Sequence, residues 1–178
     1  DLLKVENLTY KDRFDVMKLD GVSFTVRNKE IVGIAGVEGN GQSELIEIIT
    51  ANLRARSGQV LFKNEDITKA SIDHVRKLGM SYVPEDRLYN GCAAIMSVQE
   101  NMIVSNIDSF AKKSKLIDFK KVKEHCKALI KEYNVKTKDE NQPIKSLSGG
   151  NIQKAIVARE FCAGSDLLVL DQPTRGVD

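Results

Sequence analysis

Alternating and continuous apolar positions predict several strands along the chain. Apolar and polar residues alternate in VSFTVR (22–27), the period of two that marks a half-buried strand. Residues 2–9 have a strand pattern as well, and QVLFK and MSYV are short segments of strand length. Two further runs are almost wholly apolar, residues 31–35 and residues 167–170. We expect both to be strands and the second to be buried.

Apolar residues recur every three or four positions in three longer stretches, which predicts helices with one buried face. These stretches follow Ser43, Asp118 and Gly150. Ser71 and Ser97 are suitable N-caps for two shorter helices, the second through the capping box Ser-Val-Gln-Glu. Strands and helices in this order indicate an α/β protein. The apolar positions are Leu45, Ile48, Ile49 and Leu53, then Val122, Cys126, Leu129, Ile130 and Tyr133, then Ile152, Ala155 and Ile156.

Composition and charge exclude several other classes of protein. The net charge of +2 is too small to favour a nucleic-acid partner. No apolar run approaches the ~18–20 residues that a membrane span needs, and the opening DLLKVENLTY does not resemble a signal peptide. The cysteines and histidines lack the spacing of a disulfide framework or a zinc site, so we expect free thiols in a reducing cytosol. They are Cys92, Cys126, Cys162, His74 and His125.

A glycine-rich segment, IVGIAGVEGNGQS, lies between the apolar run at 31–35 and the first long helix. Strand, glycine loop and helix in this order are the layout of a P-loop, G-x-x-x-x-G-K-[ST]. Glycine lets backbone N–H groups approach an anion, and the following helix adds its positive N-terminal end. Ser43 matches the last position, but Gln42 stands where the pattern has lysine. On this segment alone, a tight turn without a ligand is the other interpretation.

Two later segments add to this pattern. LSGGN (147–151) is a second glycine turn that opens a helix. LLVLDQPTRGVD (167–178) is an apolar run that ends in a carboxylate, Asp171. In open α/β sheets, ligands bind at the edge where the strands end.

In this order and at this spacing, the three segments resemble the nucleotide-binding domains of ABC transporters. GVEGNGQSEL, VPEDR, LSGGN-x-QK and QPTRGVD together are similar to the second, C-terminal ATP-binding domain of fused bacterial ATPases. Those ATPases energise the import of simple sugars and nucleosides, and the nucleoside subgroup is the most similar. The resemblance covers nearly the whole chain. It implies one domain over residues 1–178, with a RecA-like P-loop core, an antiparallel β subdomain and a helical signature subdomain at residues 84–150.

The resemblance also implies roles for individual residues. Residues 36–43 match the Walker A loop, which wraps the phosphates of ATP: Gly36, Val37, Glu38, Gly39, Asn40, Gly41, Gln42 and Ser43. The Mg²⁺ ligands of the family match Ser43 and Asp171. The signature, which meets the γ-phosphate of ATP held by a partner domain, matches Ser148, Gly149 and Gly150. Asp178 matches the D-loop aspartate, and Tyr10 or Phe14 is a candidate for stacking on adenine.

Three positions depart from the family's pattern, and they affect catalysis. Gln42 replaces the Walker A lysine. A neutral hydrogen bond is worth about 1 kcal/mol against about 1.5–3 for a charged one, so we expect ATP binding to weaken about tenfold. Gln172 replaces the glutamate that positions or deprotonates the attacking water, and loss of a general base typically costs about 10²–10⁴ in rate. Glu85 falls where the family has the Q-loop glutamine.

We therefore expect this chain's own half-site to hydrolyse ATP poorly, while its signature completes a partner's site. Gln172 fits a naturally degenerate site and also a substitution that traps a bound nucleotide. The implied partners are a second ABC nucleotide-binding domain, fused in the full chain, transmembrane permease subunits and, indirectly, a solute-binding protein, but no nucleic acid. The implied location is the cytoplasmic face of a bacterial membrane. The family's switch histidine would lie beyond Asp178, so we expect a truncated chain.

In the family, the region from about residue 84 to 106 faces the membrane subunit. We expect four apolar residues to supply part of that contact, although ordinary core is the other interpretation: Leu88, Tyr89, Ile95 and Met96. A basic region follows, which we interpret as a solvated face, with contact to acidic headgroups or a partner as the alternative. Its lysines are Lys112, Lys113, Lys115, Lys120, Lys121, Lys123 and Lys127.

Two other functions remain open. A regulatory or dimerisation domain that binds no nucleotide is favoured by Gln42 and Gln172, and is opposed by Ser43, Asp171 and the loop glycines. A soluble ABC ATPase of DNA repair or translation usually carries zinc modules, coiled-coil insertions or strongly basic surfaces, and the sequence shows none of these.

Overall fold

The computed structural model describes residues 1–112 and 114–176 of the chain. These residues form two compact units, Asp1–Met80 and Ser81–Asp178, and each is described by itself. Lys113 of the basic region and Asp178, the predicted D-loop aspartate, lie outside the described residues.

The first unit is built on an antiparallel sheet with the strand order β2-β1-β3-β4. Its strands are β1 (Leu3–Lys11), β2 (Met17–Val26), β3 (Ser57–Phe62) and the short β4 (Glu65–Asp66). One face of β1 and β3 lies in the core: Val5, Leu8, Val60 and Phe62 are each at most 1% exposed. The spacing of three between Val5 and Leu8 reflects an irregularity in the pairing of β1 with β2. The strands predicted at 2–9, 22–27 and QVLFK are confirmed, and β2 begins five residues earlier than its alternating pattern indicated.

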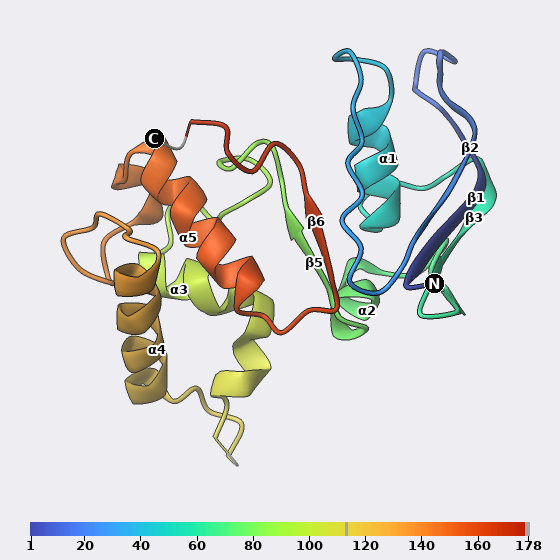
Figure 1. The fold of residues 1–178 in the computed structure, drawn as a ribbon. Coiled ribbons are helices and arrows are strands. Elements are labelled where there is room, and N and C mark those ends of the chain that lie inside the picture. The colour runs from blue at the N-terminus through green and yellow to red at the C-terminus, as the bar shows by residue number, and fades with distance from the viewer. Residues whose placement is uncertain (113, 177–178) are drawn as a thin grey trace. The chain divides into compact units, whose positions relative to one another are not determined.

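Two helices complete this unit, α1 (Gln42–Ile49) and α2 (Ile72–Lys77). α1 lies beside the sheet (Figure 1) and buries Leu45, Ile48 and Ile49, as the helical spacing predicted. Ser71 caps α2, because its hydroxyl accepts a hydrogen bond from the backbone N–H of His74 at 3.2 Å.

The strand predicted at residues 31–35 is not present, and this prediction was wrong. These residues are irregular, and their backbone makes no hydrogen bond to any residue that the structure describes. Ile31 is 99% exposed, and Val32 and Ile34 are exposed as well. An apolar sequence becomes a strand only where another strand supplies hydrogen-bond partners, and within the first unit none pairs with this segment.

The second unit is mainly helical. Its α-helices are α3 (Val98–Ile103), α4 (Phe119–Glu132) and α5 (Gly149–Phe161), and η1 (Val104–Phe110) and η2 (Ile144–Ser146) are 3-10 helices. α3, α4 and α5 pack against one another (Figure 1). Their shared core includes Val98, Met102, Val122, Cys126, Leu129, Ile152 and Ile156, each at most 3% exposed.

Two strands lie beside these helices, β5 (Met80–Val83) and β6 (Leu167–Leu170), and they form a two-stranded sheet. Both were predicted as strands. The expectation that residues 167–170 are buried was wrong, because β6 is half-buried and Leu170 is exposed. Within the described chain β6 has one neighbouring strand, and the burial of an apolar run depends on how much structure covers it.

The caps expected for α3 and α4 are also confirmed. The hydroxyl of Ser97 accepts from the backbone N–H of Glu100 at 3.2 Å, and the carboxylate of Glu100 accepts from the backbone N–H of Ser97 at 2.8 Å. Asp118 accepts from the first backbone N–H groups of α4.

We predict that Ser97→Ala destabilises α3 by about 1 kcal/mol, because the substitution leaves an N-terminal donor of the helix without its partner. Hydrogen exchange of residues 98–103 measures this as faster exchange. Ser114→Ala is the matched control, since Ser114 is an exposed serine outside any helix. Equal exchange in the two variants would contradict a stabilising role for the capping box.

Candidate functional site

The P-loop segment requires glycine at two positions of its backbone. Gly39 has φ +86° and Gly41 has φ +93°, in the left-handed region that other residues rarely adopt. A Cβ at Gly41 would also lie 2.2 Å from the backbone oxygen of Lys18 on β2. Gly41 is the N-cap residue of α1, and no side chain caps that helix. An uncapped helix N-terminus behind a glycine loop suits the binding of a phosphate group.

The side chain of Gln42 lies inside this loop. Its Nε2 donates a hydrogen bond to the backbone oxygen of Val37 at 3.2 Å. A Cβ added at Gly36 would lie 1.8 Å from that nitrogen, so the amide packs directly on the Gly36 backbone. A phosphate in the loop would therefore compete with a neutral hydrogen bond worth about 1 kcal/mol. Ser43 is exposed at the start of α1, and Val37, Glu38 and Asn40 are exposed in the loop.

The second unit carries the other acidic candidates. Asp171 follows β6 directly, and its backbone N–H donates to the backbone oxygen of Val83 on β5 at 2.9 Å. Burial and the nearby Glu85 carboxylate raise the pKa of the Asp171 carboxyl. Glu85 also forms an ion pair with Arg175. The fold thus brings Asp171 and Glu85 together where β5 and β6 end, whereas the P-loop belongs to the first unit.

Gln172 follows Asp171 with φ +46°, an unusual conformation for a residue other than glycine. Its side chain is exposed. A glutamine amide donates and accepts hydrogen bonds but does not act as a general base at neutral pH. Residue 172 is therefore accessible but cannot deprotonate an attacking water.

The signature segment forms the N-terminus of α5. Ser148 is the N-cap residue and is exposed, and Gly149 and Gly150 are the first residues of the helix. The Ser148 hydroxyl accepts from Nδ2 of Asn151 at 2.7 Å, and no side chain caps the helix. The positive end of a 13-residue helix thus carries an exposed hydroxyl.

Two arginines near these segments were missed in the sequence. Nη1 of Arg87 donates to the backbone oxygen of Arg175 at 2.9 Å, and Arg175 pairs with Glu85. Arg87 ends VPEDR and Arg175 lies in QPTRGVD, two of the segments that carry the family resemblance. Sequence spacing does not show that the two segments touch, so neither arginine received a role.

The four apolar residues expected to face a membrane subunit are exposed, so the interpretation as ordinary core was wrong. Their exposed fractions are 51% for Leu88, 87% for Tyr89, 79% for Ile95 and 42% for Met96. The Asp86 carboxylate accepts from the backbone N–H groups of Leu88 and Tyr89, which fixes this turn.

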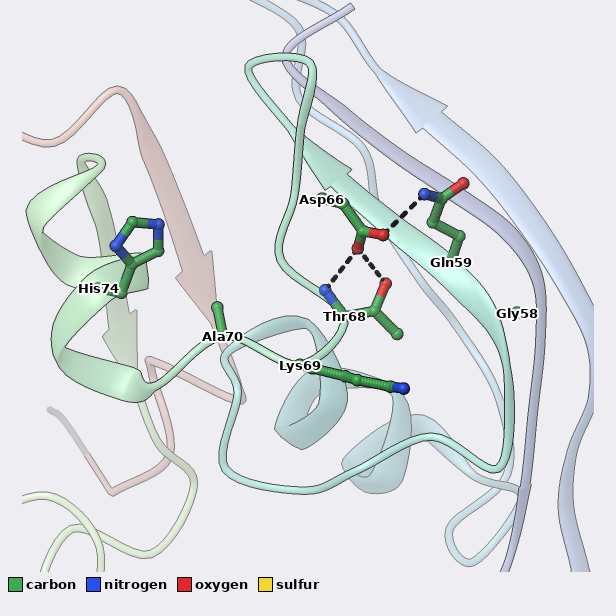
Figure 2. A pocket seen from close by; sticks show the side chains of 7 residues that line it. All are labelled: Gly58, Gln59, Asp66, Thr68, Lys69, Ala70 and His74. Carbon is green, nitrogen blue, oxygen red and sulfur yellow. Dashed lines mark hydrogen bonds between the residues drawn. The ribbon is translucent and has the colours of Figure 1, made fainter.

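Figure 2 shows a hollow in the first unit that contains none of the predicted site residues. At its edge, the Asp66 carboxylate accepts from the backbone and hydroxyl of Thr68 and from the Gln59 amide. These hydrogen bonds lower the pKa of Asp66. His74, on α2, pairs with Glu65 at 2.5 Å. The side chains of Gln59, Asp66, Thr68 and His74 are thus paired, which is the arrangement of a structural turn.

The candidates for adenine stacking and the lysines of the basic region form no shared site in the described part of the chain. Tyr10 is half-buried in β1, and Phe14 is exposed with the Arg13 guanidinium 4.8 Å from its ring centroid. In the basic region, Lys112 pairs with Asp118 at 4.0 Å and Lys123 with Glu140 at 3.0 Å.

Within the described ranges, no group of three His, Cys, Asp or Glu side chains could hold a metal ion, and no helix has the length and apolar character of a membrane span.

The profile of a protein family described as "ABC transporter" matches residues 19–175, most of the chain. The chain belongs to the ABC transporter family. It is 38% identical over 178 residues to the nucleoside import ATP-binding protein NupA of Lactococcus lactis, and 38% identical over 176 residues to the ribose import ATP-binding protein RbsA of Clostridium perfringens. These matches cover 99% of this chain but 35% and 34% of the relatives, so the chain spans about a third of their length.

Solved ABC cassettes have the same fold. A dimeric ATP-binding cassette, MJ0796, bound to ADP and Pi superimposes with a TM-score of 0.83 over 99% of this chain and 76% of the cassette, at 21% identity. A nucleotide-free cassette from an ABC transporter gives 0.74 at 28% identity, over 99% of this chain and 70% of that one. The α/β P-loop fold with an antiparallel sheet and a helical part is thereby confirmed, whereas the boundaries of a helical subdomain at 84–150 stay a prediction.

We predict that Gln42→Lys strengthens binding of MgATP about tenfold, because an ammonium group replaces a neutral donor beside the phosphates. Calorimetric titration of the full-length protein that carries this chain measures the change. Gln59→Lys, which adds the same charge on β3, is the control and should leave the affinity unchanged. No gain with Gln42→Lys would show that residue 42 does not contact the nucleotide.

Proposed function

We propose that this chain is an ATP-binding domain of an ABC importer for simple sugars or nucleosides. The P-loop, the LSGG turn and the carboxylate after β6 follow one another in the order of the family, and this is the observation that carries the proposal. The import proteins to which the chain is similar support the substrate class. Binding and hydrolysis of ATP would drive uptake of the solute.

In this proposal, the loop from Gly36 to Ser43 binds the phosphates through backbone N–H groups and the α1 N-terminus. Ser43 and Asp171 would hold Mg²⁺, which neutralises phosphate charge when it is bound. The exposed Ser43 hydroxyl and the half-buried Asp171 carboxyl are suitable oxygen ligands. Burial and the Glu85 carboxylate raise the pKa of the Asp171 carboxyl, and a bound cation would oppose this shift.

Hydrolysis at this half-site would be slow, for two reasons. Gln42 offers a neutral amide in place of a charge at the transferring phosphate, and this amide starts in a hydrogen bond to Val37. Gln172 cannot accept the proton of the attacking water. The half-site would thus bind ATP but hydrolyse it slowly.

The signature turn would complete the site of a second ABC domain. Ser148, Gly149 and Gly150 present an exposed hydroxyl and the positive end of α5 to an anion. None of the substitutions at residues 42 and 172 alters this turn. An asymmetric pair of sites follows, in which the partner's nucleotide is hydrolysed.

The exposed apolar residues 88, 89, 95 and 96 would contact a permease subunit at the cytoplasmic face of the membrane. A solute-binding protein would act on the other side of the permease. A dimerisation domain that binds no nucleotide is the second candidate, and the Gln42 amide inside the P-loop is the observation that favours it.

We predict that Ser148→Arg lowers the ATPase activity of the assembled pair of ABC domains by about tenfold or more, because a bulky side chain displaces the donors aimed at the phosphate. Steady-state hydrolysis in the complete transporter measures it. Ser114→Arg is the matched control on an exposed turn. Unchanged activity in Ser148→Arg would exclude a role of this signature in the partner's site.

We predict that Tyr89→Glu separates hydrolysis from transport. A carboxylate placed in an apolar contact is desolvated without a partner, so assembly with the permease should weaken about tenfold or more. Co-purification and solute uptake measure the loss, while ATP binding stays unchanged. Leu116→Glu, which places the same charge on another exposed apolar residue, is the matched control. Normal assembly of Tyr89→Glu would place the permease contact elsewhere.

A further inference from the structure

The guanidinium of Arg87 lies between the signature turn and the segment after β6. Its Nη1 donates to the backbone oxygen of Arg175 at 2.9 Å. A Cβ added at Gly149 would lie 2.4 Å from Nη2, and a Cβ added at Gly176 would lie 3.0 Å from Nη1. One side chain therefore packs on the backbone of both glycines.

The backbone of Arg87 belongs to a turn that is fixed on α5. The backbone oxygen of Asp86 accepts from the N–H groups of Asn90 and Gly91 at 3.0 and 3.1 Å. A Cβ added at Gly91 would lie 2.7 Å from the backbone oxygen of Arg87 and 2.7 Å from Cδ1 of Ile156, so the turn packs closely on the helix at Gly91. The next two side chains, Leu88 and Tyr89, are exposed. The turn thus directs Arg87 inward and the apolar pair outward.

The segment after β6 is held by two further contacts in the same unit. Arg175 pairs with Glu85, two residues before Arg87. Nε2 of Gln153 on α5 donates to the backbone oxygen of Pro173 at 3.1 Å. Oε1 of Gln153 is buried and has no hydrogen-bond partner in the described part of the chain. Residues 173–176 are therefore anchored both to α5 and to the segment that contains Arg87.

The position of Arg87 also has an electrostatic consequence. A cation beside the N-terminus of a helix meets the positive end of the helix dipole, which is unfavourable unless an anion is present. A phosphate at Ser148 would attract both the helix end and the guanidinium. Arginine suits this place because its planar fork can keep one donor on a carbonyl oxygen while the remaining face packs on a glycine backbone. The side chain is thus placed to respond when an anion reaches the signature turn.

We propose that Arg87 is the positioning residue that links the apolar permease-facing turn to the signature turn and to residues 173–176. This inference rests on the proposed function and adds a coupling role to it. A displacement of Leu88 and Tyr89 by a permease moves the adjacent Arg87, and its guanidinium transmits the movement to Gly149 and to the Arg175 carbonyl. By the reciprocity of linked equilibria, a phosphate bound at the signature turn alters the affinity of the turn for the permease.

The test compares Arg87→Gln, Arg87→Lys and the control Arg27→Gln in the complete transporter reconstituted in proteoliposomes. Arg27 is an exposed turn arginine of the first unit. The measured quantity is the ratio of solute-stimulated to basal ATPase activity, together with the KM for ATP. We expect Arg87→Gln to lower the ratio about fivefold or more, because coupling is lost. The KM for ATP should rise by a smaller factor, because the guanidinium also attracts a phosphate at Ser148. A merely destabilised domain would lower both rates together and leave their ratio unchanged.

Arg87→Lys keeps the charge but offers no planar fork, so it should restore the ratio only in part. If Arg87→Gln does not fold, the ratio measured for Arg87→Lys tests the inference instead. A normal ratio in either folded Arg87 variant overturns the inference. Ser148→Arg, measured in the same vesicles, distinguishes failure of the coupling role from failure of the proposed function. If Ser148→Arg is inactive while the Arg87 variants are normal, the coupling role fails and the proposed function stands. If Ser148→Arg is fully active, the signature assignment fails, and the coupling role fails with it.

Discussion

The burial of α5 in the core of the second unit is the constraint on which the candidate site depends. Ile152, Ala155, Ile156 and Ala158 are each at most 2% exposed, so the helix is packed from its second turn onward. Close packing leaves little freedom for rotation or sliding, because either would open cavities or force overlaps. The exposed signature turn at the start of the helix is therefore held in place by apolar contacts that take no part in its chemistry.

A buried polar network extends this constraint to residues 91–105, part of the segment proposed to face a permease. Nε of Arg159 donates to the Glu160 carboxylate at 2.7 Å, and its other nitrogens donate to the backbone oxygens of Gly91 and Asn101. Ser105 donates to the same carboxylate. A buried ion pair adds little net stability, but the loss of one partner is costly because it leaves an unpaired charge. The network thus specifies how residues 91–105 lie on α5 more than it strengthens the fold.

The two halves of the nucleotide chemistry have different physical origins. In the P-loop, backbone conformation is decided locally: positive φ at residues 39 and 41 and close approach to β2 leave room only for glycine. At the ends of β5 and β6 the relevant property is electrostatic, since Asp171 and Glu85 are like charges in a partly buried place and Arg175 balances one of them. Glycines make the loop possible, whereas burial and the neighbouring Glu85 carboxylate raise the pKa of the Asp171 carboxyl.

Local patterns in the sequence were sufficient for most elements of the fold. Capping residues such as Ser71, Ser97 and Asp118 predict where their helices begin, because the side chain of each accepts hydrogen bonds from backbone N–H groups a few residues away. The order of the glycine loop, the LSGG turn and the carboxylate after β6 likewise indicated the family. Only the tertiary structure decided that residues 31–35 have no strand partner, that β6 is half-buried, that the Gln42 amide lies inside the loop, and that Arg87 touches both Gly149 and Arg175. Pairing, burial and contact join residues that are far apart in the chain, and a local periodicity carries no information about what lies beside it.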